Sequence, residues 1–211
     1  MPAIERVWRD AVDEVQRDLA EWIHRMAEHP EWKPAAFELA FGIPVDASHD
    51  RASVPEAVQV GDALSLRGAI DLVEERADGA LRATDHKTGA SVSTPRMIAG
   101  GRVLQPVLYA RALEALFEGK RVVGGRLYYC TSRGRFEERF VPLDDEARAA
   151  IALLEDTLAH HLERGFLPAA PAQGECERCD YRPVCGPAEE RRVRRKHAKS
   201  LGKLKTLRSQ P

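Results

Sequence analysis

Two aspartates and a lysine within residues 68–89 have the types and spacing of a site for phosphate chemistry. Asp71 and Asp85 each lie seven residues from Asp78, which is the centre of a predicted three-residue turn between two strands. If the strands pair about that turn, the two carboxylates face each other about 5 Å apart. Lys87 is two residues beyond Asp85, so it projects from the same face of the hairpin. The segment therefore predicts a carboxylate pair with an ammonium group beside it.

The chemistry of this arrangement follows from the repulsion between the two carboxylates. Like charges directly opposite each other destabilise a hairpin, unless a divalent cation lies between them. Carboxylate oxygens suit Mg²⁺ or Mn²⁺, and such an ion lowers the pKa of a bound water and stabilises charge on a phosphate oxygen. A neighbouring lysine can orient the water or neutralise developing charge. We interpret the segment as a candidate site for phosphodiester hydrolysis; the alternative is a solvated strand face that carries charges.

Three of the four cysteines lie within ten residues, which indicates a metal rather than disulfides in a cytosolic chain. Cys176, Cys179 and Cys185 have the spacing C-x2-C-x5-C, so their thiolates can converge on one soft centre. Structural zinc is the plain alternative to an iron–sulfur centre, and zinc also requires four ligands. Cys130 lies apart on a predicted strand, as either a fourth ligand or a small buried apolar residue.

The hydrophobic pattern predicts the elements that must position these residues. Apolar residues recur at helical spacing over 4–28, and Phe37, Leu39 and Phe41 alternate as in a strand that ends at Gly42. Further strands are predicted at 57–60, 64–67, 68–75, 80–87, 122–131 and 136–143, and helices from 97 or 104 to 117 and from 144 to 164. This order predicts a mixed α/β fold rather than a regular βαβ alternation.

Composition narrows the class of protein. The chain has 211 residues, 44% of them hydrophobic and 31% charged, which fits one soluble globular domain with at most a small appendage. No apolar stretch approaches the roughly 20 residues of a membrane helix, so we expect no membrane partner. No GxxxxGK[ST] or GxGxxG motif occurs, which disfavours an ATP motor or a dinucleotide enzyme. The start, MPAIERVWRD, lacks the apolar region of a signal peptide, so we expect a cytoplasmic protein.

The net charge of −1 conceals a basic C-terminal segment. Residues 191–211 hold nine of the 32 Lys and Arg residues and none of the 33 acidic residues. A basic segment on an acidic body is typical of interaction tails, and the alternative is a frayed, solvated terminus. We predict that its densest block contacts DNA phosphates. That block consists of Arg191, Arg192, Arg194, Arg195 and Lys196.

Three short motifs occur in order along the chain: G-A-I-D at 68–71, D-H-K-T-G at 85–89 and Q-x-x-x-Y at 105–109. This ordered set resembles the PD-(D/E)XK nuclease superfamily, and more narrowly its RecB-like branch with G-x-I-D, D-x-K-T-G and Q-x-x-x-Y signatures. The resemblance covers roughly residues 37–186. It implies a restriction-endonuclease-like core, in which helices flank a mixed central β-sheet.

The resemblance also implies roles for individual side chains. Asp71 and Asp85 would be ligands of Mg²⁺ or Mn²⁺, and Lys87 would be the catalytic lysine. Gln105 and Tyr109 would lie one helical turn apart, facing the site and the DNA; the alternative is a pair on the helix surface. Glu38 matches an acidic residue on the first core strand of such nucleases, where it would aid the metal site or be a surface glutamate.

For the cysteines, the resemblance extends to AddB-type nuclease domains and to a class of CRISPR-associated nucleases. In these proteins three C-terminal cysteines, here Cys176, Cys179 and Cys185, join an earlier cysteine around a [4Fe–4S] cluster. This chain departs from the pattern, because no cysteine precedes Cys130, which is then the candidate fourth ligand. His24 is likewise the only candidate on the first helix for the metal-site histidine of the relatives.

We therefore predict a nuclease domain over 1–190, with its core at 37–186 and a cysteine segment at 176–185, followed by a basic tail at 191–211. The expected function is that of a Mg²⁺- or Mn²⁺-dependent deoxyribonuclease, an exonuclease in DNA repair, recombination or related DNA processing. DNA is the expected partner, and a helicase or another DNA-processing subunit is a candidate partner. The alternative is a DNA-binding or interaction module with the nuclease fold and an impaired site.

Overall fold

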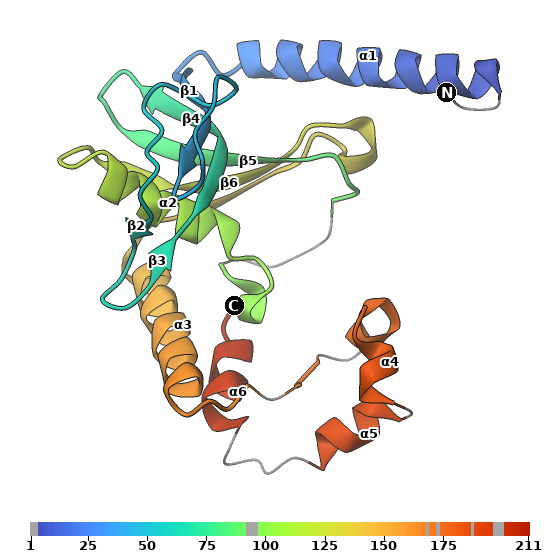
Figure 1. The fold of residues 1–211 in the computed structure, drawn as a ribbon. Coiled ribbons are helices and arrows are strands. Elements are labelled where there is room, and N and C mark those ends of the chain that lie inside the picture. Colours follow the sequence, from blue (N-terminus) through green and yellow to red (C-terminus); the bar gives the residue numbers. More distant parts are fainter. Residues whose placement is uncertain (1–3, 92–96, 168, 172–173, 187, 196–200) are drawn as a thin grey trace.

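The structure is a computed structural model, and it describes residues 4–91, 97–167, 169–171, 174–186, 188–195 and 201–211. At its centre is a five-stranded sheet in the order β1-β4-β5-β6-β7. Its strands are β1 (Trp32–Phe41), β4 (Gly68–Arg76), β5 (Leu81–Lys87), β6 (Val122–Tyr129) and β7 (Glu138–Pro142). β5 and β6 are parallel and the other neighbours are antiparallel, so the sheet is mixed, as predicted. Helices flank it (Figure 1).

The hairpin of β4 and β5 has the predicted register. Leu72 pairs with Thr84 and Glu75 with Leu81, each pair equidistant from Asp78. The turn is closed by a hydrogen bond from Arg76 N to Ala80 O at 2.9 Å. Gly79 occupies the left-handed region at φ 78°, which a three-residue hairpin loop of this kind requires.

The parallel pair β5 and β6 is joined by a crossover that contains α2 (Gln105–Leu116), because parallel strands cannot be joined by a tight turn. The helix begins at Gln105 rather than at 97, since Ala99–Gly101 form the short 3₁₀ helix η1. The first turn of α2 lies directly on β6. A Cβ atom at Gly125 would be only 1.9 Å from Pro106 O, so this close approach requires glycine.

β1 is longer than predicted and irregular. It begins at Trp32 instead of 37, and its pairing with β4 shifts between Pro34 and Ala36. Proline is tolerated there because β1 is an edge strand of the sheet. Glu38 has a φ of 49°, which an L residue rarely adopts.

The smaller elements complete the body. β2 (Val58–Gln59) and β3 (Ser65–Leu66) pair as a separate hairpin, and the 3₁₀ helix η2 (Ser132–Gly134) joins β6 to β7. The helix α3 (Asp145–Glu163) begins at a cap, because Asp144 accepts a hydrogen bond from Ala147 N at 2.9 Å. Buried side chains of α2 and α3 form the core with the sheet; they include Val107, Leu113, Ala147 and Ile151.

The helix α1 (Glu5–Ala27) confirms the predicted amphipathic helix, but none of its residues is buried. Figure 1 shows it running away from the sheet, with its C-terminal end near the body. That end makes the contacts: Trp22 meets the His86 ring at 5.4 Å between centroids, and Ser132 N donates to Asp18 at 3.0 Å. No helix among the described residues is long and apolar enough to cross a membrane.

The C-terminal residues form η3 (Glu175–Arg178), α4 (Arg182–Cys185), α5 (Glu189–Arg194) and α6 (Gly202–Arg208). Residues 201–211 are part of the folded body rather than a frayed terminus. Leu207 is buried in the main core, and Pro211 O accepts hydrogen bonds from Ile98 N at 2.9 Å and Ala99 N at 3.1 Å. The end of the chain therefore holds the segment that leads into α2.

Candidate active site

Asp85, Lys87 and Gln105 form a closed set of polar contacts at the end of β5. Lys87 Nζ lies 2.6 Å from Asp85 Oδ2, and it also donates a hydrogen bond to Gln105 Oε1 at 2.8 Å. Gln105 Nε2 donates in turn to Asp85 Oδ1 at 2.8 Å. The first residue of α2 therefore fixes both charged side chains, because the close packing of α2 on β6 brings its N-terminal turn to the sheet.

The Asp85 carboxyl is buried, with 6% of its side chain exposed. Burial raises its pKa above the ordinary value, and the Asp71 charge acts in the same direction, whereas the hydrogen bond and charge of Lys87 lower it. The net direction is upward.

Asp71 precedes Leu72 on β4, and one further step of the Leu72–Thr84 register would set it opposite Asp85. Its Oδ2 accepts a hydrogen bond from His86 N at 2.7 Å, and a third of its side chain is exposed. The peptide group between Asp85 and Lys87 thus orients the second carboxylate. The sequence-based interpretation anticipated the pair but not this backbone contact.

Tyr109 lies one turn beyond Gln105 on α2, with its ring against Phe41 at 6.4 Å and near-perpendicular. Burial raises the pKa of its phenol, and its hydrogen bond with Gln105 opposes that shift. The group is therefore a neutral hydrogen-bonding hydroxyl at ordinary pH. Glu38 is exposed on β1, between Phe37 and Leu39, at the position that faces Asp71 in the strand pairing.

A model of the PD-(D/E)XK nuclease superfamily matches residues 2–186. The chain belongs to this superfamily. It is also 32% identical over 136 residues, 63% of this chain, to the "CRISPR-associated exonuclease Cas4/endonuclease Cas1 fusion" of Myxococcus xanthus (strain DK1622). The matched region is 23% of that relative, so the chain corresponds to less than a quarter of its length.

In this PD-(D/E)XK nuclease, the carboxylates fit a hard divalent cation. Asp85 Oδ2 is buried, and its one charged neighbour among the described residues at ion-pair distance is the Lys87 ammonium at 2.6 Å. Within the described ranges, no three His, Cys, Asp or Glu side chains gather as a metal site. Two carboxylates suffice for Mg²⁺, which keeps several waters and takes substrate phosphate oxygens as further ligands.

The three clustered cysteines of this family member line one cavity of about 650 Å³. Cys176 is buried, Cys185 is partly buried and Cys179 is exposed. In the part of the chain that the structure describes, they do not converge as a group that holds a metal. Cys130 is not in this lining; it follows β6, where its N–H donates to Lys87 O at 3.1 Å.

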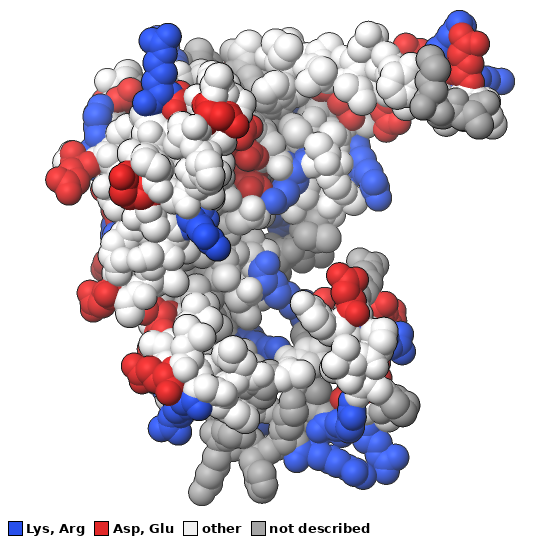
Figure 2. Space-filling view, viewed as in Figure 1, with Lys and Arg blue, Asp and Glu red and all other residues white. Residues whose placement is uncertain are grey.

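The basic block lies on and just after α5. Arg191, Arg192, Arg194 and Arg195 are exposed, and Lys196 lies outside the described residues. Figure 2 shows basic side chains gathered at the lower right of the molecule, where Figure 1 places α5. The arginine side chains are therefore presented on the surface of the segment that carries the cysteines.

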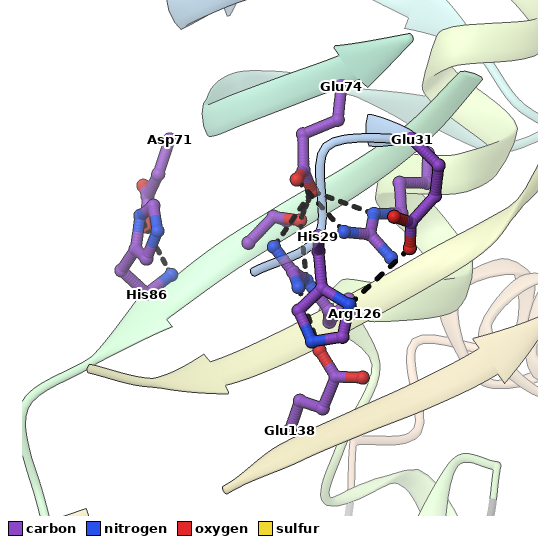
Figure 3. A network of polar contacts seen from close by, with 9 residues as sticks. His29, Glu31, Asp71, Glu74, His86, Arg126 and Glu138 are labelled. Atoms are coloured by element: carbon purple, nitrogen blue, oxygen red, sulfur yellow. Dashed lines mark hydrogen bonds and ion pairs between the residues drawn. The ribbon is translucent and has the colours of Figure 1, made fainter. Parts of the chain in front are cut away.

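On the opposite face of the sheet, the structure contains a buried polar network that sequence analysis missed (Figure 3). Glu74 is fully buried and accepts hydrogen bonds from Arg82 Nε at 2.8 Å and Nη2 at 2.9 Å, and from Arg126 Nη2 at 2.8 Å. Thr84 Oγ1 donates to it at 2.6 Å. Glu74 and Arg82 are equidistant from Asp78, so the register held a signal for this pair. Arg126 comes from β6, which no local pattern could place beside them.

Proposed function

We propose that this chain is a Mg²⁺- or Mn²⁺-dependent deoxyribonuclease that cleaves DNA from its ends. The observation that carries the proposal is the buried Asp85 carboxylate, which is paired with the Lys87 ammonium at 2.6 Å, with Asp71 held next to it by the backbone N–H of His86. Membership of the nuclease superfamily and the similarity to a protein named as an exonuclease support it. DNA repair, recombination and related DNA processing are the corresponding settings, with DNA as the partner.

Each residue of the candidate site has its own role in the proposed hydrolysis. A bound divalent ion would supply Lewis-acid stabilisation of the phosphate oxygens and a water of lowered pKa. Asp71 and Asp85 would hold that ion. Lys87 would orient the attacking water, and its ammonium would offset the negative charge that develops on the phosphate. Gln105 keeps the carboxylate and the ammonium in place through its two hydrogen bonds.

Tyr109 completes the wall of the site on the α2 side. Because the pKa of its phenol is raised, the hydroxyl stays neutral and is suited to donate a hydrogen bond to a phosphate oxygen of the DNA. The basic arginines on α5 add phosphate contacts that carry no sequence information. The arrangement thus favours recognition of the DNA backbone rather than of bases.

A nuclease assay tests the proposal. The wild-type protein should degrade linear single- or double-stranded DNA in the presence of Mg²⁺ or Mn²⁺, and EDTA should abolish this activity. Asp85→Asn and Lys87→Ala should lose cleavage while their circular-dichroism spectra stay unchanged. Glu56→Gln, which neutralises an exposed carboxylate outside these motifs, is the matched control. Covalently closed circular DNA should resist an exonuclease. If the protein bound DNA but cleaved it with none of the metals tested, the alternative of a DNA-binding module with an impaired active site would be favoured.

We also propose a metal centre at Cys176, Cys179 and Cys185, with a [4Fe–4S] cluster first and zinc as its alternative. The support is that three thiols within ten residues line one cavity. Cys130, the fourth-ligand candidate from the sequence, is not in this lining. Anaerobically purified protein should be brown and contain iron, and Cys179→Ser should lose the colour. Colourless protein with stoichiometric zinc would decide for zinc, and protein without either metal would refute the proposal.

A further inference from the structure

The first two-thirds of α1 present an apolar stripe that no described part of the chain covers. Six large apolar side chains of this helix are at least half exposed, with fractions from 50% to 63%. They are Ile4, Val7, Trp8, Val15, Leu19 and Ile23. A large apolar or aromatic side chain has about 150–250 Å² to bury, so together they expose roughly 600 Å². That equals the largest patch found on a typical monomer, and such patches mark interaction sites.

The stripe has a period that suits a second helix. Ile4, Trp8 and Ala11 are repeated eleven residues later by Val15, Leu19 and Trp22. An eleven-residue repeat gives about 3.67 residues per turn, close to a straight helix, so a neighbouring helix can stay in contact along the whole stripe. A core-packing stripe would instead be covered by the body, as only the Trp22 end is here.

The area and the shape of the molecule identify the occupant as a second copy of this chain. Without Ile23, which lies beyond the paired stretch, each stripe has roughly 500 Å² to bury, so two copies bury roughly 1,000 Å², at the low end for a specific interface. The stripe is self-complementary, as a twofold-symmetric dimer requires. The body is attached at the C-terminal end of α1 (Figure 1), so an antiparallel pair places the two bodies at opposite ends, whereas a parallel pair would bring them together at one end.

We propose that two copies of this chain pair through α1 in antiparallel orientation. Ile4 then faces Leu19 of the second copy, Trp8 faces Val15, and the small Ala11 lies at the twofold axis, where it lets the helices approach. The stretch from Ile4 to Leu19 is about 22 Å long at 1.5 Å per residue. The pairing leaves β4, β5 and the face of α2 that carries Gln105 uncovered.

Sedimentation velocity of the full chain from 1 to 100 μM tests the pairing. The mass of the wild type should rise toward twice 23.5 kDa over this range. Val15→Glu/Leu19→Glu should weaken association about tenfold or more, because it buries charges in the apolar contact. Gln16→Glu/Ala20→Glu adds the same charge outside the stripe and should associate like wild type. A wild-type protein that is still monomeric at 100 μM would overturn the proposal and indicate that the stripe binds a different protein. A dimer that Val15→Glu/Leu19→Glu does not weaken would place the interface elsewhere and would also overturn it.

Cross-linking tests the orientation. A mixture of Ile4→Cys and Leu19→Cys proteins should form a disulfide between these two positions, identified by mass spectrometry of the linked peptides. Ile4→Cys alone should not link to itself, and wild type shows the background from the native cysteines. A self-linked Ile4→Cys dimer would indicate parallel helices and overturn the antiparallel arrangement.

Discussion

Replacing Glu74 should destabilise the protein more than replacing any exposed acid, because two buried arginines depend on it. The Glu74 side chain is 1% exposed, and those of Arg82 and Arg126 are 9% and 3% exposed. Arg82 directs both Nε and Nη2 to Glu74, whereas Arg126 also contacts Thr84 and Glu138. Removal of one partner from such a buried group costs about 3–5 kcal/mol, since uncompensated charge is left inside.

The loss can be measured by urea unfolding followed by tryptophan fluorescence. We expect Glu74→Ala to lower the free energy of unfolding by about 3–5 kcal/mol, and Glu74→Gln, which keeps the size and one acceptor oxygen, by less. Glu138→Ala is the matched control. The Glu138 side chain is 48% exposed, and of the two network arginines it pairs only with Arg126. Its replacement should therefore lower the free energy of unfolding by only about 0–1 kcal/mol.

The same residue gives a pH dependence. Burial acts to raise the pKa of Glu74, but the hydrogen bonds from Arg82 and Thr84 and the charge of Arg126 outweigh it, and the pKa lies below its ordinary 4.5. A lowered folded-state pKa stabilises the protein above the unfolded pKa, and this contribution is lost as the pH falls through the folded value. The difference between wild type and Glu74→Gln should therefore shrink below about pH 4.5. Equal stability of Glu74→Ala and Glu138→Ala at pH 7 would refute this account.

Three further predictions concern the site and its supports. Burial raises the pKa of Asp85 above its ordinary 3.8, so Mn²⁺, which needs the ionised carboxylate, should bind more tightly as the pH rises through the range in which Asp85 titrates; an affinity for Mn²⁺ that does not change with pH would contradict this. Gly125→Ala should lower the free energy of unfolding by about 1–3 kcal/mol, because the new Cβ would meet Pro106 O and push α2 from the sheet. The same shift would move Gln105 and should reduce cleavage. Urea unfolding measures the first effect and the nuclease assay the second. Replacing four arginines by glutamine should flatten the dependence of log affinity on log salt by about 0.7 per residue for single strands and 0.9 for duplex, and an unchanged slope would exclude them from the DNA contact. These are Arg191, Arg192, Arg194 and Arg195, and the substitutions leave the core residue Leu207 in place, which a truncation at 191 would remove.

Local patterns predicted the hairpin that carries the two aspartates. The turn at Asp78-Gly79 and the alternation of the flanking residues fix a register, because a slip of one residue would exchange the two faces of each strand. Asp71, Asp85 and Lys87 could thus be placed together before the fold was known. Gln105 was reached through the family motif, since its approach to Lys87 depends on the packing of α2 on Gly125, far along the chain.

Long-range packing explains what the sequence did not reveal. The basic composition of 191–211 hides the apolar spacing of Leu201, Leu204 and Leu207, and only the fold shows that Leu207 enters the core. Glu38 has a left-handed φ of 49° although the pairs on either side of it keep one register, and no strand pattern in the sequence indicates this. The first helix was predicted correctly as amphipathic, yet amphipathicity alone does not say whether its apolar side meets the body.

Because α1 contacts the body through its C-terminal end, its angle to the sheet has a large effect on the position of its other end. From Trp22 to Ile4 the helix is about 27 Å long, so a rotation of 10° about Trp22 displaces Ile4 by about 5 Å. The pivot is the ring of His86, whose peptide N–H holds Asp71. A pair of chains joined through α1 would accordingly keep each β4–β5 hairpin intact while the distance between the two hairpins varied.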